Sequence, residues 1–484
     1  VELDDVDTKR IGVTGASGGG TQSMIIGAID DRVSAAMPCV MVSTSMQGGC
    51  TCENAPYLRI DQGNVDIAAA VAPRPLGLTA ADDWTVELET KGYPELSQLY
   101  SALRQPDRLT AAFNIRFKHN YNAVNRRVMY EFFNRHFELG VKAPIEESDY
   151  KPLSRQEATV WTNDYPPPSG NAIGATHEVR ILRLAARDSE LQVGRYVPKA
   201  REQYEEFRRV IGGAWETIIG RRLDQVHEVT FNSTGETKRR QHRVSIGTLD
   251  HDGEQLPVAK IYRSKMADKP TVIWISDFGK TAISDGAALN SVVSDLADAG
   301  HLIISADLFG QGEFTEDGQS SPAQRMWYQR DATKGWQRFS GYTYGYNHPL
   351  FVKRVHDVLS LIKYAQSKSK AKVYLVGIGK QAGPIVVAAL SQAADAVERT
   401  FVDTKGFRFE SLTKQDDPMF VPGAIKYLDI DGLLCLCLPG QLEVVGEERP
   451  VVQQVNASTA SSERIRWHHD TISLLSSIRG LVHP

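Results

Sequence analysis

The 484-residue sequence lacks an apolar run of about 20 residues, the length that a membrane-spanning helix needs. It also lacks a strong charge of either sign, because 55 lysines and arginines against 59 acidic residues leave a formal net charge of −4. That balance excludes the basic footprint by which proteins bind nucleic acid or an anionic membrane. A chain of this length can bury more than one core, so two or three domains are expected.

Cysteine is scarce, and the five cysteines cannot all pair with one another. Cys435 and Cys437 alternate within the apolar run at residues 433–438, which predicts a buried strand with two free thiols on one face. Cys39, Cys50 and Cys52 have no nearby histidines at zinc spacing and therefore indicate no metal site. The spacing leaves open a disulfide from the first of these three to one of the others.

The sequence does contain a glycine-flanked serine directly after a strand-like run. Residues 9–13 are typical of a buried strand, and residues 15–19 have the sequence Gly-Ala-Ser-Gly-Gly. This is the Gly-x-Ser-x-Gly pattern of a nucleophile elbow, in which a strained turn presents the serine and small neighbours let the next helix pass close to the strand. The pattern predicts Ser17 as the nucleophile and the Gly18 backbone N–H as an oxyanion donor.

The same turn is similar to the glycine-rich turn of short-chain dehydrogenases, which binds a dinucleotide at a helix N-terminus. That function needs a further glycine where the chain has Thr21, and an acidic residue at the end of the next strand, yet the strand-like run at residues 33–45 ends without one. The Tyr-x-x-x-Lys pattern of that family occurs only far downstream, at Tyr364 and Lys368. These departures disfavour a nucleotide cofactor, and ester hydrolysis by a serine needs no cofactor.

A serine hydrolase of this kind needs an acid and then a histidine, each at the carboxyl end of a later strand. Residues 73–80 are typical of a strand that leads into Asp82 and Asp83, and residues 109–117 of a strand that leads into His119. Taken singly, a serine between glycines is more often a turn residue, an aspartate at a strand end is commonly a helix cap, and a lone histidine is usually a hydrogen-bonded surface or core residue. Their order and their common placement after strands predict a Ser-His-Asp triad.

Residues 1–140 resemble the second half of an acetyl xylan esterase-type α/β-hydrolase, as found in multidomain carbohydrate esterases. The resemblance is carried by the elbow at 15–19, Gly-Ala-Ile-Asp-Asp-Arg at 27–32, Cys-Thr-Cys-Glu-Asn at 50–54, Ala-Pro-Arg-Pro-Leu at 72–76, Asp83 with Trp84, and His119. It implies a serine carboxylic-ester hydrolase that removes a small acyl group, acetyl in the resembling family, from a plant or algal polysaccharide. It also implies a secreted or periplasmic location.

The resemblance favours Asp83 over Asp82 as the triad acid, because the family places its acid directly before an aromatic residue, here Trp84. Adjacent residues at a strand end point in opposite directions, so a strand end that shifts by one residue would place Asp82 in this role instead. The resemblance also implies that substrate-binding residues are Glu53, Asn54, Arg59 and Trp84. The loop at 47–59 is suitably placed to shape a pocket for an acylated carbohydrate or another small ester, although a disulfide-stapled or Asn-capped surface loop explains it equally well.

Beyond residue 140 the character of the sequence changes. Residues 141–240 contain Tyr-Pro-Pro-Pro-Ser-Gly at 165–170 and predict a linker with a charged helix at 198–209. Residues 241–484 alternate strands with helices, which predicts a mostly parallel sheet covered on both faces. Strands are expected at 242–249, 256–262, 271–276, 301–307 and 372–376, and helices at 292–296 and 352–362.

A second elbow is expected at 377–383, Gly-Ile-Gly-Lys-Gln-Ala-Gly, but Gly379 occupies the serine position. This indicates a hydrolase-like domain that has lost its nucleophile. His468, His469 and Asp470 are either a relic of its triad or ordinary surface residues. The predicted fold is therefore a pair of tandem α/β-hydrolase-like domains, with 1–140 as the C-terminal half of the catalytic domain, 141–240 as the linker and 241–484 as the degenerate domain.

Only 16 residues precede Ser17, whereas this fold normally has several strands before the elbow. The strand at 9–13 is therefore expected at a sheet edge. A cleaved piece that stays bound, a fragment of a longer product, or a second unit that packs across the edge would each explain this, and the fragment is favoured.

Two other functions fit the sequence. A serine peptidase of the prolyl-oligopeptidase type shares the triad order, but such enzymes usually carry a propeller, and no blade-length repeat is visible. A non-catalytic carbohydrate-binding or scaffold protein is compatible with a degenerate second domain.

Overall fold

The computed structural model describes residues 3–44, 53–263, 270–285, 288–318, 328–331, 335–338, 340–368, 371–438, 440–446, 449–459 and 464–482. The chain forms two compact units. Unit 1 comprises Val1–Pro167 and Trp327–Asn347, and unit 2 comprises Pro168–Met326 and His348–Pro484. No described helix combines the length and the apolar character that a membrane span requires.

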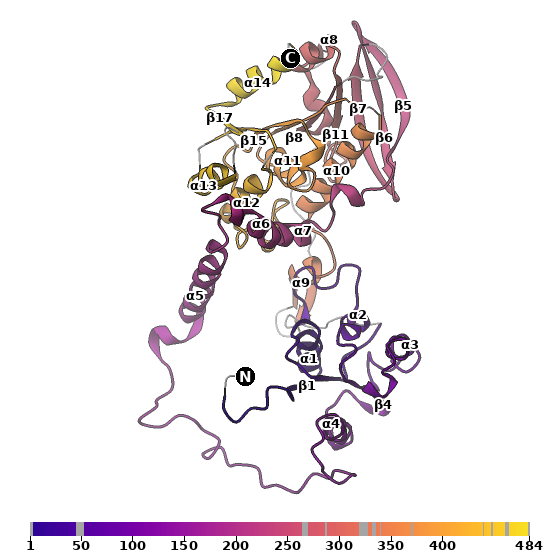
Figure 1. Ribbon diagram of the computed structural model, residues 1–484, viewed down its shortest axis with the longest axis vertical. Helices are drawn as coiled ribbons and strands as arrows, with labels where there is room; N and C mark the ends of the chain where they lie inside the picture. Colours follow the sequence, from indigo (N-terminus) through magenta and orange to yellow (C-terminus); the bar gives the residue numbers. More distant parts are fainter. Residues whose placement is uncertain are drawn as a thin grey trace. The chain divides into compact units, whose positions relative to one another are not determined.

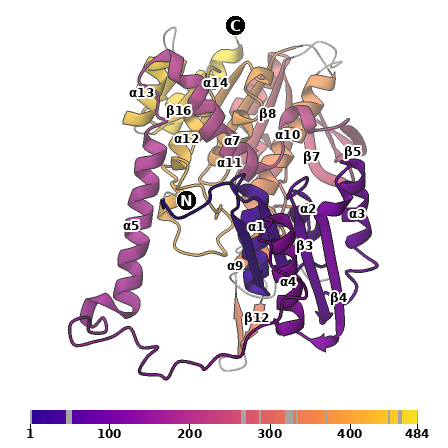
Figure 2. The same cartoon turned by 60° about the horizontal axis from the view of Figure 1, so that its bottom comes forward.

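Unit 1 is built on a parallel sheet with the order β1-β2-β3-β4 among the described strands. The strands are β1 (Gly12–Ala16), β2 (Ala35–Cys39), β3 (Leu76–Asp82) and β4 (Leu109–Lys118). Each neighbouring pair is parallel, so all four carboxyl ends lie at one edge of the sheet. Figure 2 shows β3 and β4 side by side. Within this described sheet, β1 pairs only with β2 and lies at an end of the strand order.

Helices cover both faces of this sheet. They are α1 (Gly18–Ile29), α2 (Asn64–Ala69), α3 (Tyr93–Ala102) and α4 (Ala123–His136). Because side chains alternate along a strand, Ala36 of β2 packs in the cluster formed with α1, α2 and α3, whereas Met37 packs on Phe132 of α4. Figure 1 shows α4 on the opposite face from α1. Val128, Met129 and Phe133 of α4 also pack in the cluster of Met37 and Phe132, so this side of α4 faces the sheet.

Unit 1 also contains a segment that lies between two elements of unit 2 in the sequence. It holds the antiparallel hairpin β12 (Tyr328–Asp331) and β13 (Gly335–Arg338), followed by α9 (Ser340–Tyr344). The backbone N–H of Tyr57 donates to the Tyr344 carbonyl at 2.7 Å, and that of Arg59 donates to the Gly345 carbonyl at 2.8 Å. The segment is therefore held by the loop that precedes α2, an arrangement that no local sequence pattern indicates.

Unit 2 contains a larger sheet with the described order β17-β16-β15-β14-β8-β11-β7-β6-β5. Its strands are β5 (Thr230–Arg239), β6 (His242–His251), β7 (Glu254–Tyr262), β8 (Thr271–Ser276), β11 (Leu302–Ala306), β14 (Val373–Ile378), β15 (Arg399–Asp403), β16 (Leu442–Val445) and β17 (Ile465–His468). A separate short hairpin pairs β9 (Ser284–Asp285) with β10 (Ala288–Leu289). Strands β5 to β7 pair antiparallel, and β8, β11 and β14 to β17 run parallel.

The sheet of unit 2 is covered on both faces, as its apolar strands require. Figure 1 shows α8 (Ser291–Asp298) and α14 (Thr471–Arg479) on one face, with α10 (Leu350–Lys368), α11 (Ala382–Ser391) and α12 (Asp429–Leu436) on the other. The remaining helices are α5 (Gly174–Gly194), α6 (Tyr204–Phe207), α7 (Gly213–Ile219) and α13 (Pro450–Thr459). The strands and helices expected between residues 242 and 376 are all present.

Two expectations differ from the structure. Cys435 and Cys437 were expected on a strand, but Cys435 lies in helix α12 and Cys437 directly follows it. A short apolar run has no periodicity that separates a buried strand from a buried helix, and here the surrounding core imposes the helix. Both thiols are buried and free, as predicted. The helix expected at 198–209 begins at Tyr204 and continues through a π-helical turn at Arg208–Gly212 into α7.

The two sheets share a topological motif. In each unit, four parallel strands follow one another across the sheet in chain order, β1 to β4 in unit 1 and β14 to β17 in unit 2. In each, a helix follows the first of the four strands after a short turn that contains glycine, α1 after β1 and α11 after β14. A strand, a sharp turn and a helix in this order make up the elbow of an α/β-hydrolase.

Candidate active site

Ser17 occupies the turn between β1 and α1, and its backbone is strained. Its φ is 58° and its ψ is −124°, a combination that a residue with a Cβ rarely adopts. Its N–H donates to the Cys39 carbonyl at 3.1 Å, and its own carbonyl accepts the N–H of Thr21 at 3.0 Å. The turn is thus fixed by the neighbouring strand on one side and by the helix on the other. This is the backbone geometry of a nucleophile elbow.

Glycines around Ser17 allow the helix to pass close to the sheet. A Cβ added to Gly15 would lie 2.5 Å from the Gly19 carbonyl oxygen, and one added to Gly20 would lie 2.8 Å from the Cβ of Met41. A Cβ on Gly19 would have no heavy atom within 4 Å. A side chain at Gly15 or Gly20 would therefore collide with its neighbours. A side chain at Gly19 would have room, and Gly19 matters because its backbone lies against Gly15.

The N-terminus of α1 supplies the candidate oxyanion donor. Gly18 is the first residue of this 12-residue helix. The N–H groups of a first helical turn have no acceptor within the helix, and the helix dipole places partial positive charge there. The Gly18 N–H directly follows Ser17, which is the position required of an oxyanion donor for a tetrahedral centre on that serine.

Asp83 and His119 lie in contact at the carboxyl ends of β3 and β4. Asp83 Oδ2 is 2.7 Å from His119 Nδ1. The Asp83 side chain is only 6% exposed, whereas the His119 side chain is 36% exposed. A buried carboxylate against Nδ1 fixes the tautomer of the imidazole and leaves Nε2 as the nitrogen that can accept a proton.

The second carboxylate oxygen of Asp83 is held by Thr85. Asp83 Oδ1 accepts the Thr85 N–H at 2.7 Å and the Thr85 hydroxyl at 2.6 Å. The same hydroxyl oxygen accepts the Ala81 N–H at 2.9 Å, and Thr85 is fully buried. One oxygen of the carboxylate is thus bound within its own turn, so the other is directed at His119.

Asp82 points elsewhere. Its side chain is 47% exposed and forms an ion pair with Lys118, whose side chain is 87% exposed. The pairing of β3 with β4 changes register between Ala80 and Asp82. A bulge of this kind re-aims the side chains that follow it. The structure therefore places Asp83, and not Asp82, against the imidazole.

Trp84 packs on the histidine. Its ring centroid lies 4.4 Å from that of His119, with the two planes at 37°. The Trp84 carbonyl accepts the hydroxyl of Ser43 at 2.5 Å, which ties this turn to the segment after β2. In the structure Trp84 packs on the candidate base, and its predicted contact with substrate stays a prediction.

The structure does not place Ser17 in hydrogen-bond contact with His119. Among the described residues, no hydrogen bond joins the Ser17 hydroxyl to the imidazole. Both residues nevertheless lie at the same edge of the parallel sheet, because each directly follows the carboxyl end of a strand. In ligand-free enzymes the bond between nucleophile and base is often long and tightens only when substrate binds.

The other predicted substrate-binding residues lie in the loop before α2. Glu53, Asn54 and Arg59 are all at least 94% buried. The Arg59 guanidinium donates to the Glu53 carbonyl at 3.1 Å and to the Asn64 side-chain oxygen. Burial lowers the pKa of Arg59. These contacts give Arg59 a structural role in holding the loop, and a contact with substrate stays a prediction.

Part of the predicted loop lies outside the described residues, including Cys50 and Cys52. Cys39 is a buried free thiol, so the disulfide that the spacing left open is absent at this residue. Burial raises the pKa of the Cys39 thiol, as expected of an inert core cysteine. No group of three or more His, Cys, Asp or Glu side chains in the described part of the chain is arranged to hold a metal ion.

Sequence reasoning missed Thr85 and Ser43, which hold the turn that carries the acid. We expect Thr85→Val to lower kcat about tenfold with little change in KM, because a hydrogen bond to a charged acceptor is lost while the side-chain shape is kept. The variant should also lose about 1–3 kcal/mol of stability, since the Ala81 N–H loses its partner. Steady-state kinetics on a small ester and thermal unfolding measure the two effects.

Thr85→Ser is the matched control, because serine keeps the hydroxyl and should keep most of the rate. If Thr85→Val unfolds earlier yet turns over substrate like the parent, Thr85 supports the fold without positioning Asp83.

Comparisons with known proteins found similarity only among solved structures. No family model matches the chain, and no curated protein matches it by sequence. Among solved structures, a methylesterase is 34% identical over 28% of this chain, with a TM-score of 0.27, and the chain spans only 32% of that protein's length. A candidate acetyl xylan esterase from Bacteroides fragilis is 10% identical, over 65% of this chain and 85% of that chain, with a TM-score of 0.45.

Other matched structures are another esterase and a peptidase. A glucuronoyl esterase from Solibacter usitatus is 11% identical, over 53% of this chain and 86% of that chain, with a TM-score of 0.34. A prolyl endopeptidase is 13% identical, over 51% of this chain and 38% of that chain, with a TM-score of 0.33. Two further matched structures are acetyl xylan esterases, one from a Thermoanaerobacterium species and one from a Paenibacillus species, each 11% identical with a TM-score of 0.35. The parallel sheet, the strained elbow and the strand-end Asp–His pair of unit 1 are the features of an α/β-hydrolase fold, which the sequence predicts.

Proposed function

We propose that the chain is a serine carboxylic-ester hydrolase whose nucleophile, base and acid are Ser17, His119 and Asp83. The observation that carries the proposal is the 2.7 Å contact between Asp83 Oδ2 and His119 Nδ1, at the same sheet edge as the strained turn of Ser17. A buried acid that orients a half-exposed imidazole, at the sheet edge that also carries an elbow serine, supports a catalytic triad.

The reaction follows from these positions. His119 Nε2 takes the proton of the Ser17 hydroxyl as its oxygen attacks the ester carbonyl, and the Gly18 N–H donates to the oxyanion that forms. The protonated imidazole then gives that proton to the departing alcohol, which leaves an acyl group on Ser17. A water molecule, deprotonated by the same nitrogen, attacks the acyl carbonyl and restores the free serine while releasing the acid.

We further propose that the ester is a small acyl group, acetyl above all, carried by a polysaccharide. This part rests on the resemblance of residues 1–140 to acetyl xylan esterase-type hydrolases, and the names of the matched structures are consistent with it. The triad geometry by itself also fits a peptidase, so the substrate class has to be tested separately from the nucleophile.

A fluorophosphonate probe tests the nucleophile directly. We expect the intact mass to rise by one probe adduct and the modified peptide to contain Ser17. A parallel assay compares acetylated xylan, a glucuronate methyl ester and a peptide amide. Release of acetate alone supports the proposal, faster cleavage of the amide favours the peptidase, and a chain without any adduct or turnover is not a serine hydrolase.

Unit 2 is proposed to be chemically silent, because glycine occupies its elbow. Gly379 follows β14, as Ser17 follows β1. The Asp277 carboxylate fills the neighbouring space, with Oδ1 accepting the N–H of Gln381 at 3.0 Å and of Ala382 at 2.8 Å. The start of the helix after this elbow is therefore already bound to a carboxylate of the chain itself. His469 directly follows β17, as His119 directly follows β4.

Restoring a serine there should not restore activity. A Cβ on Gly379 would lie 2.3 Å from the Asp277 carboxylate, and φ at this position is 141°. We expect Ser17→Ala and the double variant Ser17→Ala/Gly379→Ser to hydrolyse a small ester equally slowly. An increase in turnover in the double variant, together with a probe adduct in the peptide of residue 379, would contradict the proposal that Asp277 blocks this elbow.

A further inference from the structure

Unit 2 contains a cleft that the proposed reaction does not use. Its volume is about 750 Å³, and it is lined by Asp250, His251, Asp252, Gly253, Glu254, Gln255, Phe309, Phe314, Lys353 and Asp357. Phe309 follows the carboxyl end of β11, and the turn between β6 and β7 flanks that end because β7 runs antiparallel to β11. Ligands of open α/β sheets bind beyond the carboxyl ends of the strands. The cleft therefore lies where this fold binds ligands.

Two phenyl rings form an apolar wall of the cleft. Phe309 is 49% exposed, and Phe314 is 40% exposed. Their ring centroids lie 5.5 Å apart in an edge-to-face arrangement. Large apolar residues that remain exposed side by side in a cleft, rather than singly on the surface, mark a binding surface.

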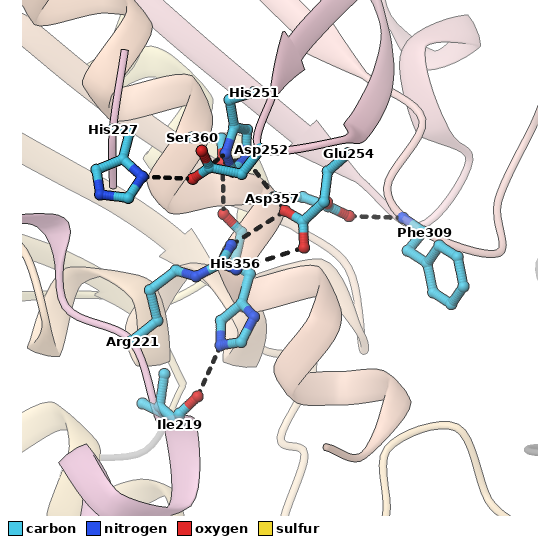
Figure 3. A network of polar contacts seen from close by, with 10 residues as sticks. All are labelled: Ile219, Arg221, His227, His251, Asp252, Glu254, Phe309, His356, Asp357 and Ser360. Atoms are coloured by element: carbon cyan, nitrogen blue, oxygen red, sulfur yellow. Dashed lines mark hydrogen bonds and ion pairs between the residues drawn. The ribbon is translucent and has the colours of Figure 1, made fainter. Parts of the chain in front are cut away.

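The polar side of the cleft carries carboxylates that the fold holds in place. Asp252 Oδ2 accepts from His227 Nδ1 at 2.8 Å, and Glu254 pairs with Arg221 at 3.1 Å (Figure 3). Asp357 Oδ2 accepts the backbone N–H of Phe309 at 2.7 Å, which joins the polar side to the apolar wall. Each carboxylate is thus fixed through part of its hydrogen-bonding capacity, so binding need not order it.

A buried imidazole adds an unused polar atom. The His251 side chain is 3% exposed, and its Nε2 lies 2.7 Å from the Ser360 hydroxyl and 3.1 Å from Glu254. Its Nδ1 has no hydrogen-bond partner in the described part of the chain and is 3.6 Å from Asp252 Oδ2. A buried polar atom without a partner is costly, so this side of the cleft is not fully satisfied by the chain's own groups.

The charges favour a neutral ligand over a cation. Arg221 and His227 pair with two of the carboxylates, and Lys353 also lines the cleft. Burial raises the pKa of Asp357 to about 7, so this carboxyl is partly neutral near physiological pH. A ligand with many hydroxyl groups and an apolar ring face matches both walls, because hydroxyls hydrogen-bond to carboxylates while C–H groups pack on phenyl rings.

We propose that this cleft binds a saccharide without cleaving it. One sugar ring packs on Phe309 and Phe314, and its hydroxyl groups bond to Asp252, Glu254 and Asp357. This site goes beyond the proposed esterase reaction of unit 1, and it does not depend on Ser17.

Affinity electrophoresis of the full chain tests the site. Native gels contain xylan, acetylated xylan, polygalacturonate or glucomannan, and all proteins carry Ser17→Ala so that no ester is consumed during the run. At least one polysaccharide should retard the parent, and Phe309→Ala/Phe314→Ala should weaken the retardation at least tenfold. Phe278→Ala is the matched control, because Phe278 is 73% exposed in the same unit and lies outside the cleft lining, and it should bind like the parent.

Further measurements separate binding from folding and from catalysis. Asp357→Asn should weaken binding several-fold, and thermal unfolding of each variant shows whether it is folded. In chains that retain Ser17, Phe309→Ala/Phe314→Ala should not change the turnover of p-nitrophenyl acetate. If the Ser17→Ala chain binds a polysaccharide but the chain that retains Ser17 turns over no ester, the esterase proposal fails and the cleft stands. The saccharide site would be overturned if retardation survived the loss of both phenyl rings, or if none of the four polysaccharides retarded the chain. Saturable binding of choline, a cation, in place of a saccharide would also overturn it.

Discussion

Replacing Ser17 by alanine should abolish ester hydrolysis and labelling by a fluorophosphonate. In triad enzymes, loss of the nucleophile lowers kcat by about 10⁴-fold or more, because only binding and oxyanion stabilisation remain. The fold should survive the change. Ser17 adopts a strained backbone with φ of 58°, and alanine has the same Cβ, so the strain is unchanged. The measurements are initial rates on p-nitrophenyl acetate, intact mass after probe treatment, and thermal unfolding.

Ser23→Ala is the matched control, because Ser23 lies one and a half turns further along the same helix. It is 2% exposed, and its hydroxyl donates to the Gly19 carbonyl at 2.7 Å. Removing that bond perturbs the packing of α1 without touching the elbow hydroxyl, so activity and labelling should persist. A Ser17→Ala protein that keeps more than a tenth of the parent rate would show that another residue is the nucleophile.

The strands and the elbow could be predicted because their signals are local. The run at 109–117 indicates a strand and is found as β4 at Leu109–Lys118, and the run at 271–276 is found as β8. Each combines apolar, strand-favouring residues with glycine or polar residues at its ends. The elbow is visible for the same reason, since a serine between glycines after a strand is itself the structural requirement.

What could not be predicted depends on contacts between distant residues. The apolar run that contains Cys435 forms a helix because the core of unit 2 surrounds it, and periodicity over six residues cannot show this. Helix α9 joins unit 1 through backbone bonds to Tyr57 and Arg59, which leave no trace in either sequence segment. Thr85 is an ordinary threonine in the sequence, and only the fold shows that its hydroxyl holds Asp83.

The second large effect is expected for Asp83→Asn, which should lower kcat by about 10⁴-fold, as in other triads. An amide at this position presents an N–H as readily as an oxygen to His119 Nδ1. The imidazole then holds its proton on Nε2 and cannot accept the one from the serine. Asp82→Asn should change the rate little, since it removes an exposed ion pair with Lys118, a kind of contact worth about 0–1 kcal/mol.

This pair of variants decides which residue is the triad acid. Asp82 and Asp83 are adjacent and chemically identical, and they differ only in where their side chains point. Asp83 faces the imidazole at 2.7 Å from within the protein, whereas Asp82 is 47% exposed. Asp83→Asn should leave the KM for a small ester nearly unchanged, since the acid contacts the base and not the substrate. Equal losses in both variants would mean that the turn as a whole, and not the Asp83 carboxylate, supports the base. A larger loss in Asp82→Asn would mean that the strand end shifts by one residue when substrate binds, so that Asp82 becomes the acid.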